Sequence, residues 1–323
     1  MRIVVSGSIA YDYIMVFPGQ FKDHILPDKV HVLSVSFLVE TLKKMRGGTA
    51  PNIAYNLALL GAGPAVLGTV GQDFGEYSAW LSQRGVDTSL IEVIADDFTS
   101  SCFVNTDLSA NQITAFYPGA MAHAHTQHIH ELAAKPDFVI IAPNDPAVMG
   151  QHADECRAQG IPYMYDPSMQ APRMTGEALK AGAAGARILI GNDYEFAMMA
   201  EKIGCTEDEL RRLVPLTIVT KGAEGATIYA DGEVIEIPAA DTPQVVDPTG
   251  AGDAFRAGFV RGFLGGLPLA VAGRMASLAA VYAIEQRGAQ EHAYSAAEFV
   301  ERYAENFGAS PELASLFGTE VAA

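Results

Sequence analysis

The chain is poor in cysteine, in basic residues and in long apolar runs, and each shortage excludes a class of protein. Only 3 of its 323 residues are cysteines. Cys102, Cys156 and Cys205 stand far apart with no CxxC pair, so neither a disulfide framework nor a zinc ribbon is predicted. Such cysteine usage is typical of the reducing cytoplasm, and a cytoplasmic protein is therefore expected.

Basic residues are outnumbered, with 21 Lys and Arg against 38 Asp and Glu and a formal net charge of −17. A surface of that sign repels extended polyanions, so we expect no nucleic-acid partner and no binding to anionic membranes. No apolar run approaches the roughly 18 residues that cross a bilayer. The amino terminus also lacks the basic and cleavage regions of a signal peptide. These features predict a soluble protein that holds any phosphate group by local devices.

Two common glycine-rich phosphate loops are missing as well. The chain has no GxxxxGK[ST] loop and no GxGxxG after a strand, which removes the support for a P-loop or dinucleotide-binding protein. Low-complexity linkers and internal repeats are absent too. With 49% hydrophobic and 18% charged residues, the composition is that of a compact globule. We expect one domain over residues 1–323.

What the chain does contain is an alternation of buried-strand and helical patterns from residue 50 onward. The expected strands lie at residues 65–70, 138–142, 162–165, 188–191 and 216–220, and expected helices include 74–84 and 146–159. Strands that alternate with helices of this length indicate βαβ units. The pattern predicts an α/β fold with a mainly parallel sheet flanked by helices on both faces.

Three segments break this rhythm. Residues 12–18, 29–37 and 99–118 are extended and partly alternating, and no helical pattern separates the two runs within the last segment. They predict antiparallel strands that form a small accessory sheet, which we expect to act as a lid. Exposed strand edges make a homodimer through these lid strands physically reasonable.

The clearest chemical signal is DPTGAGD at residues 247–253. Gly250 and Gly252 let the backbone turn without a Cβ, and a helical pattern follows. Such a turn aims N–H groups and a helix N-terminus at one point, which makes an anion cradle. Beside it, Asp253 could accept a proton from a hydroxyl while the cradle neutralises a transferring phosphoryl group. Taken alone, the motif more often marks only the first turn of a helix.

Extended to DPTGAGDAF, the stretch resembles the signature of the ribokinase-like carbohydrate kinase family. A second family hallmark, GGxxxN, is matched by GGTAPN at residues 47–52. The two motifs stand in the family's order on a chain of suitable length. The resemblance implies a ribokinase-like fold with a β-sheet lid, ATP and Mg²⁺ as cofactors, and room for a monovalent cation such as K⁺. It also implies that Asp253 is the catalytic base and that Gly250, Ala251 and Gly252 form the anion hole.

A sugar-binding set is implied by the same resemblance. Asp12, Gly48 and Asn52 match family residues that contact the sugar, and an acceptor-only carboxylate suits two hydroxyl donors. From the residues alone, Asp12 is equally a loop-starting aspartate and Asn52 a helix cap. Pro51 replaces the glycine usual in this turn, but proline fits the first turn of a helix, so we expect the fold to be kept.

A nucleotide set is implied at two later turns. Asn192 and Glu195 match the family's NxxE motif, and Thr220, Gly222 and Gly225 match its TxGxxG loop. The resemblance implies that Glu195 orders Mg²⁺, mostly through metal-bound water. From the residues alone, the first motif is an N-cap followed by acidic residues, and the second is a plain glycine turn.

Free ribose is disfavoured as the substrate, because Ala10 and Thr49 stand where ribokinases carry Asn and Lys. Several stretches instead resemble bacterial, especially actinobacterial, adenosine kinases, among them GSIA at residues 7–10 and FYPGAM at residues 116–121. The resemblance implies phosphorylation of the 5′-hydroxyl of adenosine by ATP. A kinase for another nucleoside or a sugar, and a catalytically silent nucleoside-binding protein, remain as alternatives.

Further contacts follow from the adenosine kinase resemblance. It implies that Ser8, Ser36 and Phe116 line the nucleoside pocket, where an aromatic face and short hydroxyls suit a purine. Arg173 matches a basic residue near the phosphoryl path, although an exposed surface arginine fits its sequence nearly as well. Asp247 is the least defined carboxylate of the set, since it could simply brace its loop.

Histidines are concentrated between residues 123 and 130, where they form two HxH pairs. Such pairs can bind metal ions. The surrounding run has helical spacing and no nearby cysteine, so we expect a solvated helix face there rather than a metal site.

Overall fold

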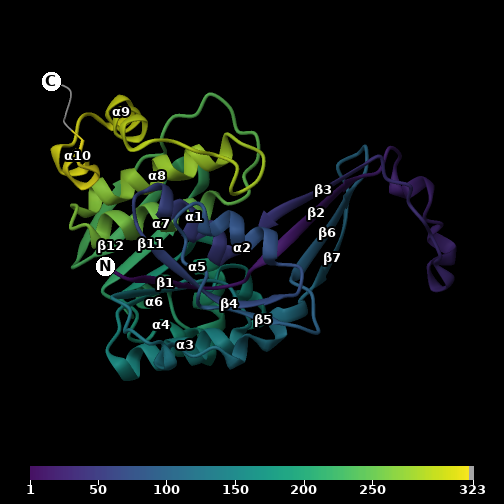
Figure 1. The fold of residues 1–323 in the computed structure, drawn as a ribbon, viewed down its shortest axis with the longest axis horizontal. Helices are drawn as coiled ribbons and strands as arrows, with labels where there is room; N and C mark the ends of the chain where they lie inside the picture. The colour runs from purple at the N-terminus through teal and green to yellow at the C-terminus, as the bar shows by residue number, and fades with distance from the viewer. Residues whose placement is uncertain (320–323) are drawn as a thin grey trace.

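The computed structural model describes residues 1–319, which form two sheets of unequal size (Figure 1). The larger sheet has nine strands in the order β13-β12-β11-β10-β9-β8-β1-β4-β5. Strands β11 through β5 run parallel, whereas β12 and β13 are antiparallel additions at one edge. The strands span β1 Ile3–Ser6, β4 Pro64–Gly71, β5 Ile91–Ile94, β8 Phe138–Ile141, β9 Tyr163–Tyr165, β10 Ile188–Asn192, β11 Leu216–Thr220, β12 Ala226–Ala230 and β13 Glu233–Ile237.

Helices cover both faces of this sheet, because successive strand side chains point to opposite sides. The first layer packs on the side of Val5 and contains α1 Thr49–Leu59, α2 Gly75–Ser82, α7 Ala251–Leu264, α8 Leu269–Ile284, α9 Ala296–Phe307 and α10 Pro311–Phe317. The second packs on the side of Val4 and contains α3 Pro146–Gln159, α4 Gly176–Ala183, α5 Asp193–Ile203 and α6 Glu207–Arg211. The predicted α/β class is therefore confirmed.

Local sequence explains where the helices begin and end. Helix α3 spans the predicted residues because the Asp145 carboxylate accepts a hydrogen bond from the Ala147 amide at its start. At its end, Gly160 adopts a left-handed conformation with φ 59°. All five predicted strands of the parallel sheet are present as β4, β8, β9, β10 and β11. Within residues 1–319, no helix combines the length and the apolar character needed to span a bilayer.

The smaller sheet has four strands in the order β3-β2-β6-β7 and projects from the body of the molecule (Figure 1). Its strands are β2 Ala10–Val16, β3 Thr41–Gly47, β6 Ser100–Thr106 and β7 Gln112–Tyr117. We call it the lid. The predicted strands near 12–18 and within 99–118 correspond to β2, β6 and β7. Not every pair is antiparallel as predicted, because β2 and β6 run parallel.

One predicted lid strand, residues 29–37, is wrong. Pro27–Val32 form a 3-10 helix, and the residues that follow up to 39 are irregular. The fourth lid strand is β3, whose sequence TLKKMRG is mostly exposed and carries three basic residues. The valines at positions 30, 32 and 35 favour a strand only if a neighbouring strand completes the hydrogen-bond ladder. In this chain β3 occupies the place beside β2, with seven residues in register.

Candidate active site

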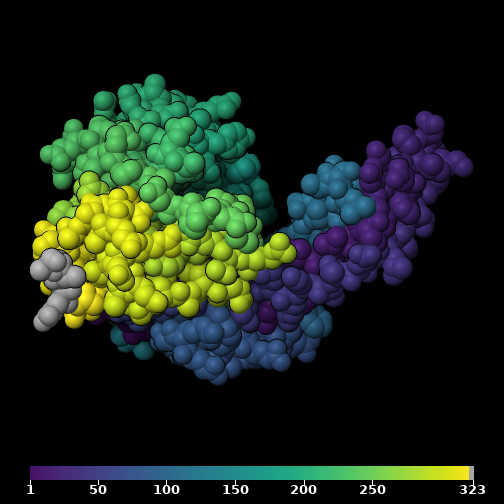
Figure 2. Space-filling view, turned by 90° about the horizontal axis from the view of Figure 1, so that it is seen from above, coloured from purple at the N-terminus to yellow at the C-terminus, as the bar shows by residue number. Residues whose placement is uncertain are grey.

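Most of the predicted site residues lie along the edge where the carboxyl ends of the parallel strands approach the lid. Asn192 ends β10 and pairs in register with Thr220, which ends β11. Asp12 lies in β2, which follows shortly after β1. Ligands of parallel α/β sheets bind outside this edge. Figure 2 shows the lid standing away from the body with an open hollow between them.

Helix α7 begins at the glycine turn, and this places Asp253 in its first turn. Gly250 precedes the helix with φ 82°, in the left-handed region that favours glycine. A Cβ at this position would lie only 2.5 Å from the Cβ of Ala289. The tight turn therefore depends on glycine, and it brings the free N-terminal amides of α7 next to the Asp253 carboxylate.

Asp253 contacts a residue from the other signature motif. The Asn52 amide donates a hydrogen bond to its Oδ2 at 2.8 Å, and the Asn52 oxygen accepts one from Gln290 at 2.6 Å. Burial raises the pKa of Asp253 to about 6, although nearby Arg256 and the Asn52 hydrogen bond oppose the shift. A carboxylate with such a pKa can accept a proton near neutral pH and release it afterwards.

Asp12 and Phe116 share one face of the lid. Asp12 pairs in register with Cys102 of β6, and Cys102 pairs with Phe116 of β7. Residues directly opposite in a sheet point to the same side, so Asp12 and Phe116 lie two strand spacings apart, about 10 Å. The Phe116 side chain is 52% exposed. Burial and the negative charge of Asp247 raise the pKa of Asp12, which indicates that this face of the lid looks toward the 247–253 turn.

Ser8 and Gly48 are brought together at the start of α1. The Ser8 hydroxyl accepts a hydrogen bond from the Thr49 amide at 3.2 Å. Gly48 has φ 92°, and a Cβ on it would lie 2.6 Å from both the Cα of Ile9 and the carbonyl oxygen of Ser8. The crossing backbone of residues 8–10 is thus a sufficient reason for glycine at position 48, independent of any bound sugar.

The two nucleotide motifs have different local structures. Asn192 and Glu195 form a capping box on α5, in which each side chain accepts a hydrogen bond from the other residue's amide at 2.8 Å. The second Glu195 oxygen accepts a hydrogen bond from the Ser168 hydroxyl at 3.1 Å. Gly222 and Gly225 border a short turn after β11 and have φ values of 57° and 88°. The local interpretation of both motifs, an N-cap and a glycine turn, is therefore present in the structure.

Two predicted residues, Ser36 and Arg173, make no hydrogen bond to Asp253 or Asn52 among residues 1–319. Ser36 precedes Phe37, which packs against Phe17 beyond the far end of β2, about 16 Å along the strand from Asp12. Arg173 is exposed, and its guanidinium donates to the Gln170 side chain at 3.2 Å.

Asp247 braces the turn that precedes α7. Its two carboxylate oxygens accept hydrogen bonds from the amides of Thr249 at 2.9 Å and Gly288 at 3.0 Å. Burial alone would raise the pKa of Asp247, but these hydrogen bonds prevail and lower it. The ionised carboxylate thus ties the turn to the loop that follows α8.

Sequence reasoning missed a buried ion pair at this site. Arg256 of α7 is 6% exposed, and its Nη2 donates to the Asp166 carboxylate at 2.7 Å. Nε of Arg256 also contacts Asp166, which follows β9 and has no exposed surface. The available signal was an arginine within the apolar run AFRAGF at residues 254–259, because a charge on a buried helix face requires a partner.

Comparison with known protein families covers most of the chain. The model of the pfkB family carbohydrate kinases matches residues 6–296. The chain belongs to the pfkB family of carbohydrate kinases. The resemblance based on the two glycine motifs is thereby confirmed.

Several relatives of this pfkB kinase are named nucleoside kinases. A nucleoside kinase of Methanothermobacter thermautotrophicus is 31% identical over 315 residues, which cover 96% of this chain and 98% of the relative. The structure of Burkholderia thailandensis nucleoside kinase in complex with inosine is 38% identical, with a TM-score of 0.84 and coverage of 95% and 98%. The nucleoside kinase of Methanocaldococcus jannaschii gives a TM-score of 0.85 at 28% identity, with coverage of 94% and 98%.

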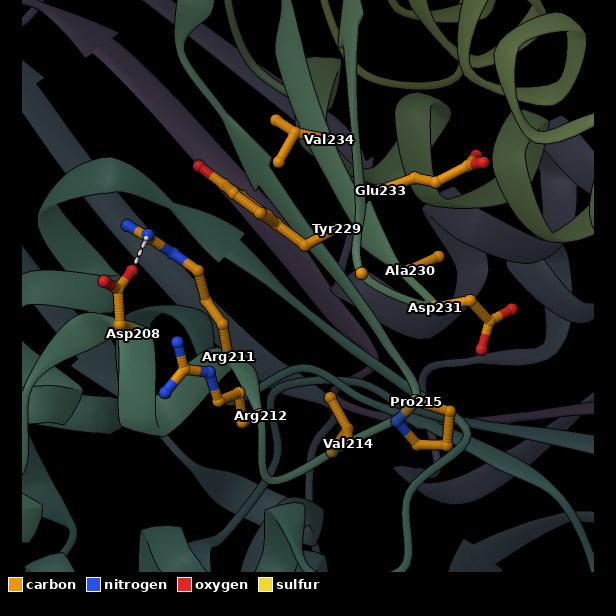
Figure 3. Close-up of a pocket in the computed structure, with 11 residues that line it drawn as sticks. Asp208, Arg211, Arg212, Val214, Pro215, Tyr229, Ala230, Asp231, Glu233 and Val234 are labelled. Carbon is orange, nitrogen blue, oxygen red and sulfur yellow. Dashed lines mark hydrogen bonds and ion pairs between the residues drawn. The ribbon is translucent and has the colours of Figure 1, made fainter.

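A separate hollow lies at the opposite edge of the larger sheet. It has a volume of about 460 Å³ and is lined by residues near the β12–β13 turn and the end of α6. Figure 3 shows Arg211 beside Tyr229 with its hydrogen bond to Asp208. This hollow adjoins the start of β11, whereas the nucleotide motif follows its end at Thr220, so it is not part of the kinase site.

The histidine run of this pfkB kinase forms 3-10 helices, η3 Gly119–Thr126 and η4 Ile129–Glu131, rather than one solvated α-helix. His128 and His130 approach one Glu155 oxygen at 2.6 Å and 3.2 Å, and the three side chains could reach a common ion. The other Glu155 oxygen accepts from the Ile129 amide at 2.6 Å. The hydrogen bonds of Glu155 with His128 and Ile129, together with the contact of His130, account for the cluster without a metal ion.

Proposed function

We propose that this kinase transfers the γ-phosphoryl group of ATP to the 5′-hydroxyl of a nucleoside, with adenosine as the substrate. The observation that carries the proposal is the position of Asp253. Its carboxylate, whose pKa burial raises to about 6, adjoins the N-terminal amides of α7. A proton acceptor and an anion-binding helix start on one turn are what phosphoryl transfer to a hydroxyl requires.

In the proposed reaction, Asp253 removes the proton of the 5′-hydroxyl as its oxygen attacks the γ-phosphorus. The bond from that phosphorus to the bridging oxygen breaks, and ADP leaves. The amides of Gly250, Ala251 and Gly252 would neutralise the charge on the moving phosphoryl group. Asn52, which donates to Asp253 at 2.8 Å, would keep the base oriented toward the acceptor.

The lid would supply the nucleoside contacts. Asp12 would accept hydrogen bonds from two ribose hydroxyls, and Phe116 in the same row of the sheet would stack on the base. Ser8 and Gly48 would border the ribose from the start of α1. Closure of the lid over the hollow would exclude water as a competing acceptor. It would bring Ser36 nearer to the ligands, while Arg173 would approach the phosphoryl path from the body.

Mg²⁺ fits the donor set at the nucleotide end. Glu195 contributes a carboxylate oxygen whose only partner among residues 1–319 is the Ser168 hydroxyl, and Mg²⁺ prefers such hard oxygen donors and retained waters. When bound, the ion would offset the charge of the phosphates. Asn192, Thr220, Gly222 and Gly225 would contact the nucleotide, and K⁺ is proposed as a monovalent activator.

Inosine is a second candidate substrate. The solved Burkholderia thailandensis nucleoside kinase, 38% identical to this chain, was obtained in complex with inosine and, in another structure, with ADP-inosine. Adenosine and inosine differ at position 6 of the purine, so a pocket that reads mainly the ribose and the flat face of the base would accept both.

The deciding experiment measures ADP release with adenosine, inosine, guanosine, ribose and fructose 6-phosphate. We expect turnover with adenosine and none with ribose, with Asp253→Asn as the control that retains nucleoside binding but loses transfer. Turnover with inosine alone would replace adenosine by the second candidate. Activity on ribose alone would identify a sugar kinase, and binding of nucleoside without any transfer would identify a silent binding protein.

We also propose a homodimer that forms through the lid. Large apolar side chains are exposed on the segment between β2 and β3, which projects farthest from the body in Figure 2: Leu26, Val30, Val32, Leu33, Val35 and Leu38. Apolar surface of this extent on a projecting segment is costly in water and favours association. A second copy, related by a twofold axis, would cover the same segment of both chains.

A further inference from the structure

Arg256 lies at the anion hole in a way that the family motifs do not describe. It follows Asp253 by one turn of α7, and side chains of a helix lean toward its N-terminus. Its guanidinium is therefore folded back over the first turn. A Cβ on Gly252 would lie 2.5 Å from Nη1 of Arg256, so Nη1 rests against the backbone of an anion-hole glycine.

The other edge of this guanidinium is already occupied. Nε and Nη2 both face the Asp166 carboxylate, with Nη2 donating at 2.7 Å. The side chains of Arg256 and Asp166 are only 7% and 1% exposed. A two-point contact of this kind fixes the plane and the direction of the guanidinium. Asp166 therefore holds Arg256 by one edge and leaves Nη1 to point elsewhere.

Nη1 has no such partner. It makes no hydrogen bond with any residue from 1 to 319, although the arginine is more than nine-tenths buried. Unlike Nε, Nη1 keeps some access to solvent, so a ligand that enters at the glycine turn can reach it and accept its hydrogen bond. A purely structural brace between α7 and β9 would need only the edge that Asp166 already binds. The free edge, aimed at the glycine turn, indicates an anionic ligand at the helix N-terminus.

We propose that Arg256 is a further catalytic residue and that Asp166 is its positioning residue. Nη1 donates to a peripheral oxygen of the phosphoryl group during transfer, where charge is spread over three oxygens. Asp166 keeps the guanidinium in place before the ligands arrive, so no reorganisation is needed at the moment of reaction. This inference rests on the proposed phosphotransfer, and it adds a buried cation to a site otherwise described by the α7 amides, Mg²⁺ and the exposed Arg173.

Variants can separate this role from a structural one. Removing Arg256 alone would leave Asp166 buried and unpaired, which endangers the fold. The informative variant is therefore the double substitution Asp166→Asn with Arg256→Met, which removes both charges at nearly constant volume. Arg261→Met is the matched control, because Arg261 lies on the same helix but donates to the Leu60 carbonyl at 3.0 Å, away from the turn.

The experiment measures kcat and the nucleoside KM of the three proteins, together with their melting temperatures. In the double variant we expect kcat to fall by about 100- to 1000-fold, as when one preorganised donor to a transition state is lost, with KM changed less than threefold. Arg261→Met should keep the kcat of the wild type. As a second readout, aluminium fluoride should tighten ADP binding in the presence of nucleoside in the wild type but not in the double variant.

Each result decides one question. A folded double variant whose kcat stays within threefold of the wild type, or which still binds ADP and aluminium fluoride synergistically, would overturn the role of Arg256. If the double variant does not fold, the single variant Asp166→Asn is measured instead. It retains Arg256 without its clamp, and an unchanged kcat there would contradict the positioning role. Absence of nucleoside turnover in the wild type would reject the proposed function itself, independently of the variants.

Discussion

Asp253 derives its proposed reactivity from residues that are distant in the sequence. Asn52 donates to it from 201 positions away, and Arg256 lowers its pKa from the same helix. Burial outweighs both effects and raises the pKa to about 6. An exposed aspartate titrates about two units lower, so the environment sets the pH range in which this carboxylate can act as a base.

This shift predicts a pH dependence. Only the ionised carboxylate accepts a proton, so kcat/KM should rise about tenfold per pH unit below pH 6 and level off above it. The measurement is a profile of kcat/KM for adenosine between pH 4.5 and 9, with circular dichroism to verify that the protein stays folded at the acidic end. If kcat/KM instead falls only near pH 4, Asp253 titrates as an ordinary aspartate, and the raised pKa is contradicted.

A prediction about stability concerns Gly48. Its φ of 92° and the backbone atoms of residues 8–10 leave no room for a side chain, so Gly48→Ala should lower the free energy of unfolding by more than about 2 kcal/mol. Gly61→Ala is the matched control. Gly61 also has a positive φ of 75°, but nothing lies within 4 Å of an added Cβ, and the cost should be about 1 kcal/mol.

Urea unfolding of both variants measures this difference. Equal losses in the two variants would mean that backbone conformation alone accounts for the glycine at position 48. A larger loss in Gly48→Ala, with no added nucleoside, would support the packing of residues 8–10 as its cause.

At the scale of an element, helix α5 combines two tasks at its first turn. Its capping box uses one oxygen of Glu195, and the proposed Mg²⁺ contact uses the other. Helix α9 carries the same capping box with Ser295 and Glu298, but it packs in the other layer of helices and carries none of the predicted site residues. The chain thus offers an internal comparison between a box with a proposed metal role and one without.

Glutamine can replace glutamate in a capping box, so neither Glu195→Gln nor Glu298→Gln should change the melting temperature greatly. Loss of a negative oxygen at the metal should weaken Mg²⁺ activation about 10- to 100-fold in Glu195→Gln only. Titration of activity with Mg²⁺ measures this effect. Equal Mg²⁺ requirements in the two variants would remove Glu195 from the metal site.

The lid shows how elements depend on their neighbours. The valine-rich run at 30–35 has the composition of a strand, yet β3, with its charged TLKKMRG sequence, occupies the position beside β2. Strand preference is a weak local property, and the hydrogen-bond ladder is formed by whichever segment the chain can bring into register.

At the scale of the whole molecule, the exposed apolar segment between β2 and β3 predicts a dimer. Light scattering after size-exclusion chromatography should give twice the chain mass for the wild type. The substitutions Val32→Asp and Leu38→Asp together should produce a monomer, because they place charge on side chains that are 66% and 86% exposed. The control is Val234→Asp, which changes a 60% exposed valine on β13 and should leave the dimer intact. A monomeric wild type would contradict the proposal.

Local pattern in the sequence was sufficient for five of the seven parallel strands, for helix α3 and for the glycine turn before Asp253. Buried strands, caps and turns depend on neighbours a few positions apart, and those neighbours are visible in the chain. The two glycine motifs by themselves also indicate the pfkB family. The acidic net charge of −17 excluded a basic phosphate-binding surface and pointed to local devices.

Only the tertiary structure decided which of these elements and side chains contact one another. The contact of Asn52 with Asp253, the row that joins Asp12 to Phe116, and the clamp of Asp166 on Arg256 from 90 positions away all depend on long-range packing. The place of β3 beside β2 does so too. Sequence periodicity reports which face of an element is buried, but it carries no information about the distant residue that covers that face.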